Sequence, residues 1–219
     1  MRPTNPFSQL MVLAVALHLS ACGMTKEEGQ RGEPNAKQEA TRDVAAVTPS
    51  PRPNLQWKRY AAFEGDLARA LALTPDTLCL EFGKDPCIRK VHMVPLGGHE
   101  PFDTGMLEPA GDTLATTPTV VDRVILSACS NRLERDLAGD AKVFKGFDLT
   151  GAAPAPTAAP VRALIVDLYR RLLARDPTDD EVALVAALTQ DDAGKPVSAV
   201  DFAKLACFTI GTSTEFLFF

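Results

Sequence analysis

The sequence predicts a mainly α protein, with a single small domain of five to six helices and irregular loops over residues 55–219. Apolar residues recur at spacings of three and four, and strictly alternating runs are rare. Hydrophobic residues fill 46% of 219 positions, which is enough to build a core. The net charge is only −5, and no basic patch is interleaved with aromatic residues, so we expect no nucleic acid partner.

Short helices are predicted in the first part of this domain. Apolar residues at helical spacing, beginning with Trp57, predict an amphipathic helix over 56–73. Thr74-Pro75-Asp76 ends it and starts another, because Thr caps helices and Pro suits the first helical position. Asp85-Pro86 predicts a further short helix that runs through about Val94.

The clearest helix follows an irregular loop. The stretch 95–113 is rich in Gly, Pro and Asp and predicts that loop. Thr117-Pro118 opens the helix, which ends near Asp136. Its apolar positions form one stripe, made of Val120, Val121, Val124, Ile125, Ala128 and Cys129.

Three more helices are predicted after the Ala- and Pro-rich break at 151–160. The first begins at Val161 and is marked by leucines at helical spacing. Thr178 and Glu181 have the spacing of a capping box and start the second, which runs to about Thr189. The last covers roughly 198–210.

The end of the chain carries a recognisable pattern. "VDLYRRLLARDPTDDEVALVAAL" and "FAKLACFTIGTSTEFLFF" resemble a C-terminal helical module of large exported proteins of planctomycetes and myxobacteria. The resemblance covers residues 165–219 and implies no catalytic role. A capped helix pair with common surface residues is the alternative. Both interpretations place five side chains in the core: Leu168, Leu172, Phe216, Phe218 and Phe219. A partly exposed aromatic end is a minor alternative.

Residues 1–21 have the layout of a secretory signal peptide. An uncharged apolar run at 10–19 follows Arg2 and is about half the ~20 residues that span a bilayer. Leu19-Ser20-Ala21-Cys22 then resembles the bacterial lipobox, which implies a diacylglyceryl group on Cys22 and cleavage before it. Because Gly23 rather than Asp follows, the resemblance implies the outer membrane. The alternative is an ordinary leader with a chance cysteine.

The segment 22–54 is expected to be a flexible linker. Large apolar residues are nearly absent from it, so it cannot bury enough surface to offset its ordering entropy. As a flexible chain it would reach roughly 30 Å.

The break at 151–160 allows a subdivision of the folded domain into 55–150 and 160–219. Residues 55–219 contain more acidic than basic side chains, which argues against docking on anionic lipid.

Without Cys22, four of the five cysteines remain, and four allow three connectivities. Cys79 and Cys87 flank a short stretch with Gly and Pro to turn it, whereas Cys129 and Cys207 fall on apolar faces of predicted helices. We therefore favour Cys79–Cys87 and Cys129–Cys207, with buried free thiols as the alternative. No pair has the spacing of a thiol oxidoreductase or a zinc site.

Few residues point to chemistry. "LGGHEPFD" holds His99, Glu100 and Asp103, which would suit a divalent cation, although a Gly-Gly turn with polar surface residues explains it equally. Glu81 is a candidate general acid without a partner, and His92 is interpreted as structural or exposed. Three arginines of "LYRRLLARD" are interpreted as a solvated helix face: Arg170, Arg171 and Arg175.

The expected protein is thus a non-enzymatic lipoprotein without a cofactor, anchored in the outer membrane through Cys22. Its expected partners are the membrane and another envelope protein, by analogy in a surface machine for gliding motility or adhesion. The alternative is a periplasmic metal-binding protein or hydrolase-like enzyme centred on the His99 loop.

Overall fold

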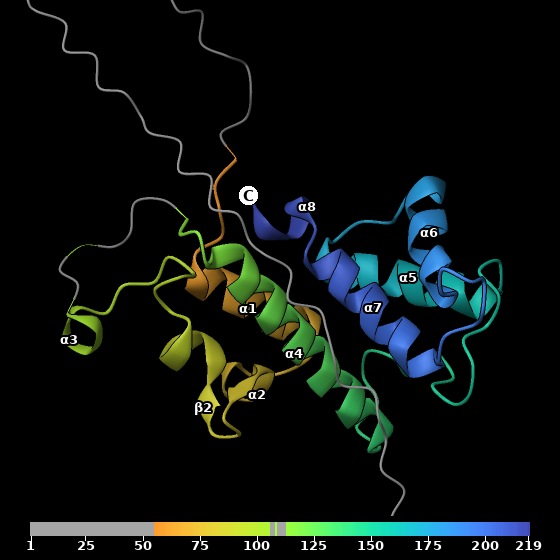
Figure 1. Ribbon diagram of the computed structural model, residues 1–219, viewed down its shortest axis with the longest axis horizontal. Helices are drawn as coiled ribbons and strands as arrows, with labels where there is room; N and C mark the ends of the chain where they lie inside the picture. Colours follow the sequence, from red (N-terminus) through yellow and green to blue (C-terminus); the bar gives the residue numbers. More distant parts are fainter. Residues whose placement is uncertain (1–54, 106–107, 109–112) are drawn as a thin grey trace, which may run out of the picture. The chain divides into compact units, whose positions relative to one another are not determined.

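The computed structural model describes residues 55–105, 108 and 113–219, without the side chains of Asp103 and Thr104 (Figure 1). The predicted signal peptide and linker, Cys22 included, lie outside the described residues. Within the described part the chain is mainly helical, as predicted. Its elements are α1 (Tyr60–Ala70), α2 (Pro75–Leu78), β1 (Leu80–Glu81), β2 (Asp85–Pro86), the π-helix η1 (Cys87–Val91), α3 (Pro101–Thr104), α4 (Thr117–Leu137), α5 (Ala159–Leu172), α6 (Asp179–Ala186), the 3₁₀-helix η2 (Ala187–Thr189), α7 (Ala199–Gly211) and α8 (Thr214–Leu217).

Helix α7 lies at the centre of the packing. It contacts α4, α5, α6 and α8, and α4 runs beside it in Figure 1. The close approach of α4 and α7 depends on Gly211, because a Cβ at that position would lie 2.8 Å from Cγ2 of Ile125. The disulfide Cys129–Cys207 joins the same two helices covalently.

The hydrophobic core continues across the break at 151–160. One cluster of buried residues includes Phe63 of α1, Ile125 of α4 and Phe202 of α7. A backbone hydrogen bond also joins the break to the segment before α7: the N–H of Ala153 donates to the carbonyl of Val197 at 2.8 Å. Residues before and after the break therefore bury their apolar faces against each other.

Helices whose signals are local begin where the sequence predicts. The predicted stripe of α4 is buried along its length, and α4 extends one residue beyond Asp136. At α6 the Thr178 hydroxyl accepts from the Glu181 N–H at 3.3 Å, while Glu181 accepts from the Thr178 N–H at 2.7 Å, so the predicted capping box forms. In the part of the chain that the structure describes, no helix is both long and apolar enough to traverse a membrane.

Two predicted helix starts are wrong. Trp57 does not belong to a helix: it forms an antiparallel bridge with Phe218, and α1 begins only at Tyr60. Asp85-Pro86 forms the second strand of a hairpin, and the Cys87 N–H donates to the Cys79 carbonyl at 3.1 Å. Backbone pairing replaces the local helical preference in both places, with a distant segment at Trp57 and within a short hairpin at Asp85-Pro86.

A buried charge pair fixes the chain after α4. Arg132 is 0% exposed and pairs with Asp136 at 2.7 Å, one turn further along the helix. The Asp136 carboxylate also accepts from the backbone N–H groups of Lys142, Val143 and Phe144. Because Asp136 binds both Arg132 and these backbone groups, the pair holds the turn that leads away from α4.

Candidate functional site

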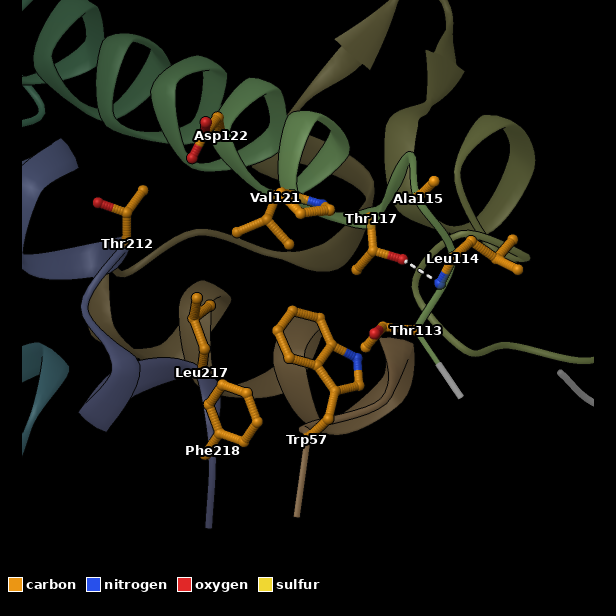
Figure 2. Close-up of a pocket in the computed structure, with 11 residues that line it drawn as sticks. Trp57, Thr113, Leu114, Ala115, Thr117, Val121, Asp122, Thr212, Leu217 and Phe218 are labelled. Carbon is orange, nitrogen blue, oxygen red and sulfur yellow. Dashed lines mark hydrogen bonds between the residues drawn. The ribbon is translucent and has the colours of Figure 1, made fainter. Parts of the chain in front are cut away.

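A pocket of about 350 Å³ opens where the first described residues, the start of α4 and the C-terminal residues meet (Figure 2). Its lining is mostly apolar and comes from three separate segments: Trp57; Thr113, Leu114, Ala115, Thr117, Pro118, Val121 and Asp122; and Thr212, Leu217 and Phe218. This volume is near the lower end of the range of small-molecule pockets, about 300–1,000 Å³.

The aromatic wall, formed by Trp57 and Phe218, is held by backbone pairing. The Lys58 N–H donates to the Leu217 carbonyl, and the Phe219 N–H donates to the Gln56 carbonyl, both at 2.9 Å. The rings of Trp57 and Phe218 consequently meet edge to face, with centroids 5.5 Å apart. The aromatic side of the pocket is therefore positioned before any ligand arrives.

The opposite wall is fixed by one hydroxyl. Thr117 is buried, donates its hydroxyl proton to the Pro95 carbonyl at 2.6 Å and accepts from the Leu114 N–H at 2.9 Å. Both contacts tie the loop ahead of α4 to the helix start. Among the described residues that line the pocket, Asp122 is the one carboxylate.

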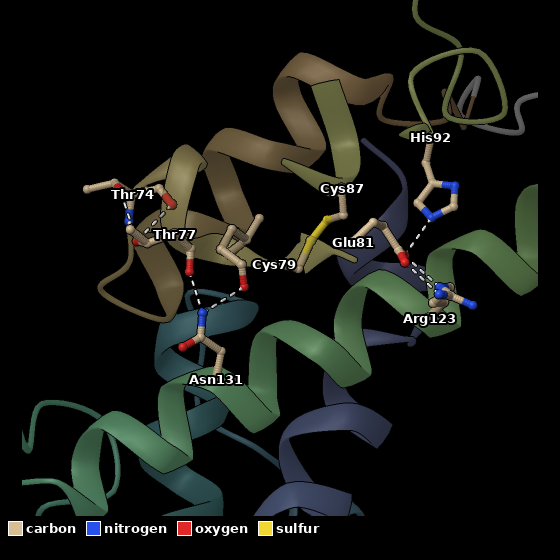
Figure 3. Close-up of a disulfide and its surroundings, with 9 residues drawn as sticks. Thr74, Thr77, Cys79, Glu81, Cys87, His92, Arg123 and Asn131 are labelled. Atoms are coloured by element: carbon tan, nitrogen blue, oxygen red, sulfur yellow. Dashed lines mark hydrogen bonds and ion pairs between the residues drawn. A yellow bond between two sulfur atoms is a disulfide. The ribbon is translucent and has the colours of Figure 1, made fainter. Parts of the chain in front are cut away.

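A second polar cluster lies beside the Cys79–Cys87 disulfide (Figure 3). Glu81 accepts from Nε and one terminal nitrogen of Arg123, each at 2.6 Å, and contacts His92 Nε2 at 3.0 Å. These hydrogen bonds, first from Arg123 and then from His92, lower the pKa of Glu81 from 4.5 to about 2. Glu81 is thus ionised at neutral pH, which corrects its interpretation as a general acid. The cluster ties the hairpin to α4.

Both favoured disulfides are present. Cys79 and Cys87 are buried, with Cα atoms 5.5 Å apart, and Cys129 and Cys207 have Cα atoms 6.0 Å apart. The first closes the β1–β2 hairpin, and the second crosses from α4 to α7. Asn131 of α4 also donates to the Thr77 and Leu78 carbonyls just ahead of the hairpin.

The C-terminal sequence pattern is accounted for by one ion-pair cluster. Arg175 donates to Glu181 of α6 and to Glu215 of α8, with shortest distances of 2.6 and 2.7 Å. Its guanidinium carbon also lies 5.3 Å from the ring centroid of Tyr169. The Arg175 and Thr178 hydrogen bonds lower the pKa of Glu181 to about 2. Arg175 is therefore a structural clasp between three helices, not part of a solvated face.

Other residues of the C-terminal segment divide between core and surface. Leu168, Leu172 and Phe216 are buried, as predicted. Phe218 is only partly buried because it lines the pocket, and Phe219 is 66% exposed. The prediction of a core position is wrong for these last two, since pairing with Gln56 and Trp57 holds them at the edge of the fold. The arginines Arg170 and Arg171 pair with Asp176 and Asp167.

The proposed metal-binding loop is described only in part. His99 Nδ1 is buried and has no hydrogen-bond partner among the described residues, and Glu100 occupies the position just before α3. The Asp103 side chain lies outside the described part. Among the side chains that the structure does describe, no group of three His, Cys, Asp or Glu residues is arranged to hold a metal ion.

Comparison with known proteins returned no family model, no curated protein and no solved structure that matches this chain.

Sequence reasoning missed the pocket. The spacing of apolar residues places Trp57 in a helical stripe, and the sequence pattern assigns no role to Asp122. No local signal identifies them, because the lining residues are contributed by segments that only the fold brings together. Trp57 is, however, the single tryptophan of the chain, which makes the pocket convenient to monitor.

Proposed function

We propose that this protein is an outer-membrane-anchored lipoprotein whose helical body docks onto another component of the cell envelope. The anchor is the acylated thiol of Cys22, and residues 23–54 connect it to the body. By analogy, the assembly is a surface machine such as one for gliding motility or adhesion.

The observation that carries this proposal is the distribution of cysteines. The four cysteines other than Cys22 are joined in two disulfides, which is typical of exported proteins in oxidising compartments. Cys22 is the one left over, and it stands in the lipobox-like Leu19-Ser20-Ala21-Cys22. Acyl chains at Cys22 would contribute ~0.8 kcal/mol per buried methylene, and two or three chains suffice for stable anchoring.

Docking is favoured over catalysis by the character of the described sites. Glu81 and Glu181 are each neutralised by an arginine, so neither is a free acid or base. The pocket in Figure 2 is apolar and its aromatic wall is held by the backbone. A preformed apolar pocket is the kind of site that accepts an anchor side chain from a partner.

The anchoring is tested by detergent-phase partitioning of the full chain produced in a Gram-negative bacterium. We expect the wild type to enter the detergent phase, to incorporate labelled fatty acid and to sediment with outer membranes. Cys22→Ser should move to the aqueous phase and lose the label. The paired variant Cys79→Ala/Cys87→Ala is the control and should keep both properties. A labelled Cys22→Ser protein would refute the anchor.

Docking is tested separately by affinity capture from detergent-solubilised envelopes. We expect one envelope protein in stoichiometric amount, retained at moderate salt. If the chain is recovered alone, both with and without gentle cross-linking, a stable assembly is contradicted.

A further inference from the structure

We propose that the pocket in Figure 2 binds an apolar side chain that stands beside a positive charge, in a segment of the envelope partner. This inference rests on the proposed function, because it names the chemistry by which the body recognises the partner.

The apolar part of the guest follows from the size and lining of the pocket. A volume of about 350 Å³ accommodates one bulky side chain rather than an extended ligand. Trp57 and Phe218 form one wall, and Val121 and Leu217 lie near them in Figure 2. Aromatic and aliphatic walls of this kind desolvate an anchor residue at the centre of an interface.

The charge of the guest follows from Asp122. It is the one charged residue in the lining, its side chain is exposed, and no ion pair or hydrogen bond to it is found among the described residues. The charge of the next residue, Arg123, is already offset by Glu81, which accepts from Nε and one terminal nitrogen of its guanidinium (Figure 3). The pocket therefore carries a net negative charge at its rim.

The start of α4 does not reverse this preference. A helix N-terminus attracts anions through its free N–H groups. Here the Thr117 N–H donates to the Leu114 carbonyl, the Val120 N–H donates to the Thr116 carbonyl, and Pro118 has no N–H. Most of the donors that would hold an anion are therefore absent or already used.

Two hydroxyl groups of the lining already use their protons in hydrogen bonds. Thr117 and Thr212 give their hydroxyl protons to the backbone carbonyls of Pro95 and Phe208, at 2.6 and 2.9 Å. The indole N–H of Trp57 is buried and has no hydrogen-bond partner among the described residues. An ammonium or guanidinium group, which only donates hydrogen bonds, matches the exposed carboxylate of Asp122.

The test uses three probes with the same apolar part and different charges: 4-phenylbutylamine, 4-phenylbutanol and 4-phenylbutyrate. The protein is the full chain with Cys22→Ser, so that the result does not depend on acylation. Binding is followed by the fluorescence of Trp57, the single tryptophan. We expect the amine to bind about two- to fivefold more tightly than the alcohol, as for an exposed ion pair, and the carboxylate to bind most weakly.

Two variants make the test specific. Asp122→Asn should bring the amine and the alcohol to equal affinity, whereas Asp192→Asn, an exposed carboxylate outside the pocket lining, should change nothing. Ala115→Phe fills the pocket from an exposed position and should abolish binding of all three probes.

Three outcomes would overturn the proposal: no fluorescence response to the amine, equal affinity for amine and carboxylate, or a preference that survives Asp122→Asn. Tighter binding of the carboxylate would indicate a fatty-acid-like ligand instead. None of these outcomes affects the partitioning of the wild type into detergent, so failure of the pocket and failure of the anchor remain distinguishable.

Discussion

Arg175 and Glu215 are forty positions apart in the sequence, yet two nitrogens of the Arg175 guanidinium each donate to a carboxylate oxygen of Glu215 at 2.7 Å. Because Arg175 also binds Glu181, this contact fastens α8 to the start of α6. Phe218, which lines the pocket, follows directly from α8.

Removing this contact should weaken the fold modestly. We expect Glu215→Gln to lower the free energy of unfolding by about 1 kcal/mol, since the pair is partly exposed. Glu134→Gln, a change of an exposed glutamate on α4, is the matched control. Urea denaturation followed by circular dichroism measures both, and equal stabilities for the two variants would contradict a structural role for the clasp.

The buried pair of α4 should be much more sensitive. Asp136→Asn removes the buried charge partner of Arg132, leaving it only the half-exposed Asp140, and weakens three backbone hydrogen bonds. We expect a loss of about 3–5 kcal/mol in unfolding free energy. Asp140→Asn, whose carboxylate is half exposed and 3.2 Å from Arg132, should cost much less, because exposed ion pairs contribute little. Thermal unfolding ranks the two, and the reverse ranking would refute this account.

The disulfides should stabilise the fold unequally. Cys79 and Cys87 are separated by 8 positions, and Cys129 and Cys207 by 78. The loop-entropy relation then gives about 2.6 kcal/mol for the first bridge and about 4.5 kcal/mol for the second. Guanidinium unfolding of the double alanine variants measures these losses. If removal of the hairpin bridge costs more, constraint of the unfolded chain is not the main effect.

Stability should fall with acid through Glu81. Its pKa is about 2 in the folded protein and near 4.5 when unperturbed, so the unfolded chain takes up a proton first as the pH falls. The contribution is fully present above pH 4.5 and is lost progressively toward pH 2. We expect the stability gap between wild type and Glu81→Gln to shrink from pH 6 to pH 3, as measured by urea unfolding. A constant gap would contradict the assigned pKa.

The hairpin tip offers a stabilising change. Phe82 has φ +53° and is followed by Gly83 at +72°, which is the pattern of a type I′ turn, and its side chain is 84% exposed. Asn tolerates this conformation better than Phe, so Phe82→Asn should raise the unfolding free energy by up to about 1 kcal/mol. Lys84→Asn, at a neighbouring position without positive φ, should give no gain. Loss of stability in Phe82→Asn would indicate that the exposed ring makes a contact worth more than the strain.

The sequence was a good guide where the signal is local. The stripe of α4 and the capping box at Thr178 each depend on residues within a few turns of one helix, and both were confirmed. The disulfide pairing was also accessible, because four cysteines leave few arrangements and two of them lie close in the chain.

Sequence reasoning failed where distant segments meet. Trp57 fits a helical pattern, but pairing with Phe218 decides its structure. The charged stretch around Arg175 is typical of a solvated helix face. Arg175 joins the helices only because Glu215 of α8 approaches its guanidinium. Asp122 lines a pocket only because the fold brings the C-terminal residues to the start of α4. Each case depends on contacts between residues far apart in the chain, which no local pattern encodes.

The pairing of Gln56 and Lys58 with Phe219 and Leu217 has a mechanical consequence. Tension on the chain ahead of Leu55 loads the Gln56–Phe219 hydrogen bond first and the Lys58–Leu217 bond next, in series. Breaking them detaches Trp57 from Phe218, which separates one wall of the pocket before any core helix is disturbed. Tension on the segment that contains Gln56 and Lys58 would therefore open the pocket and release a bound guest.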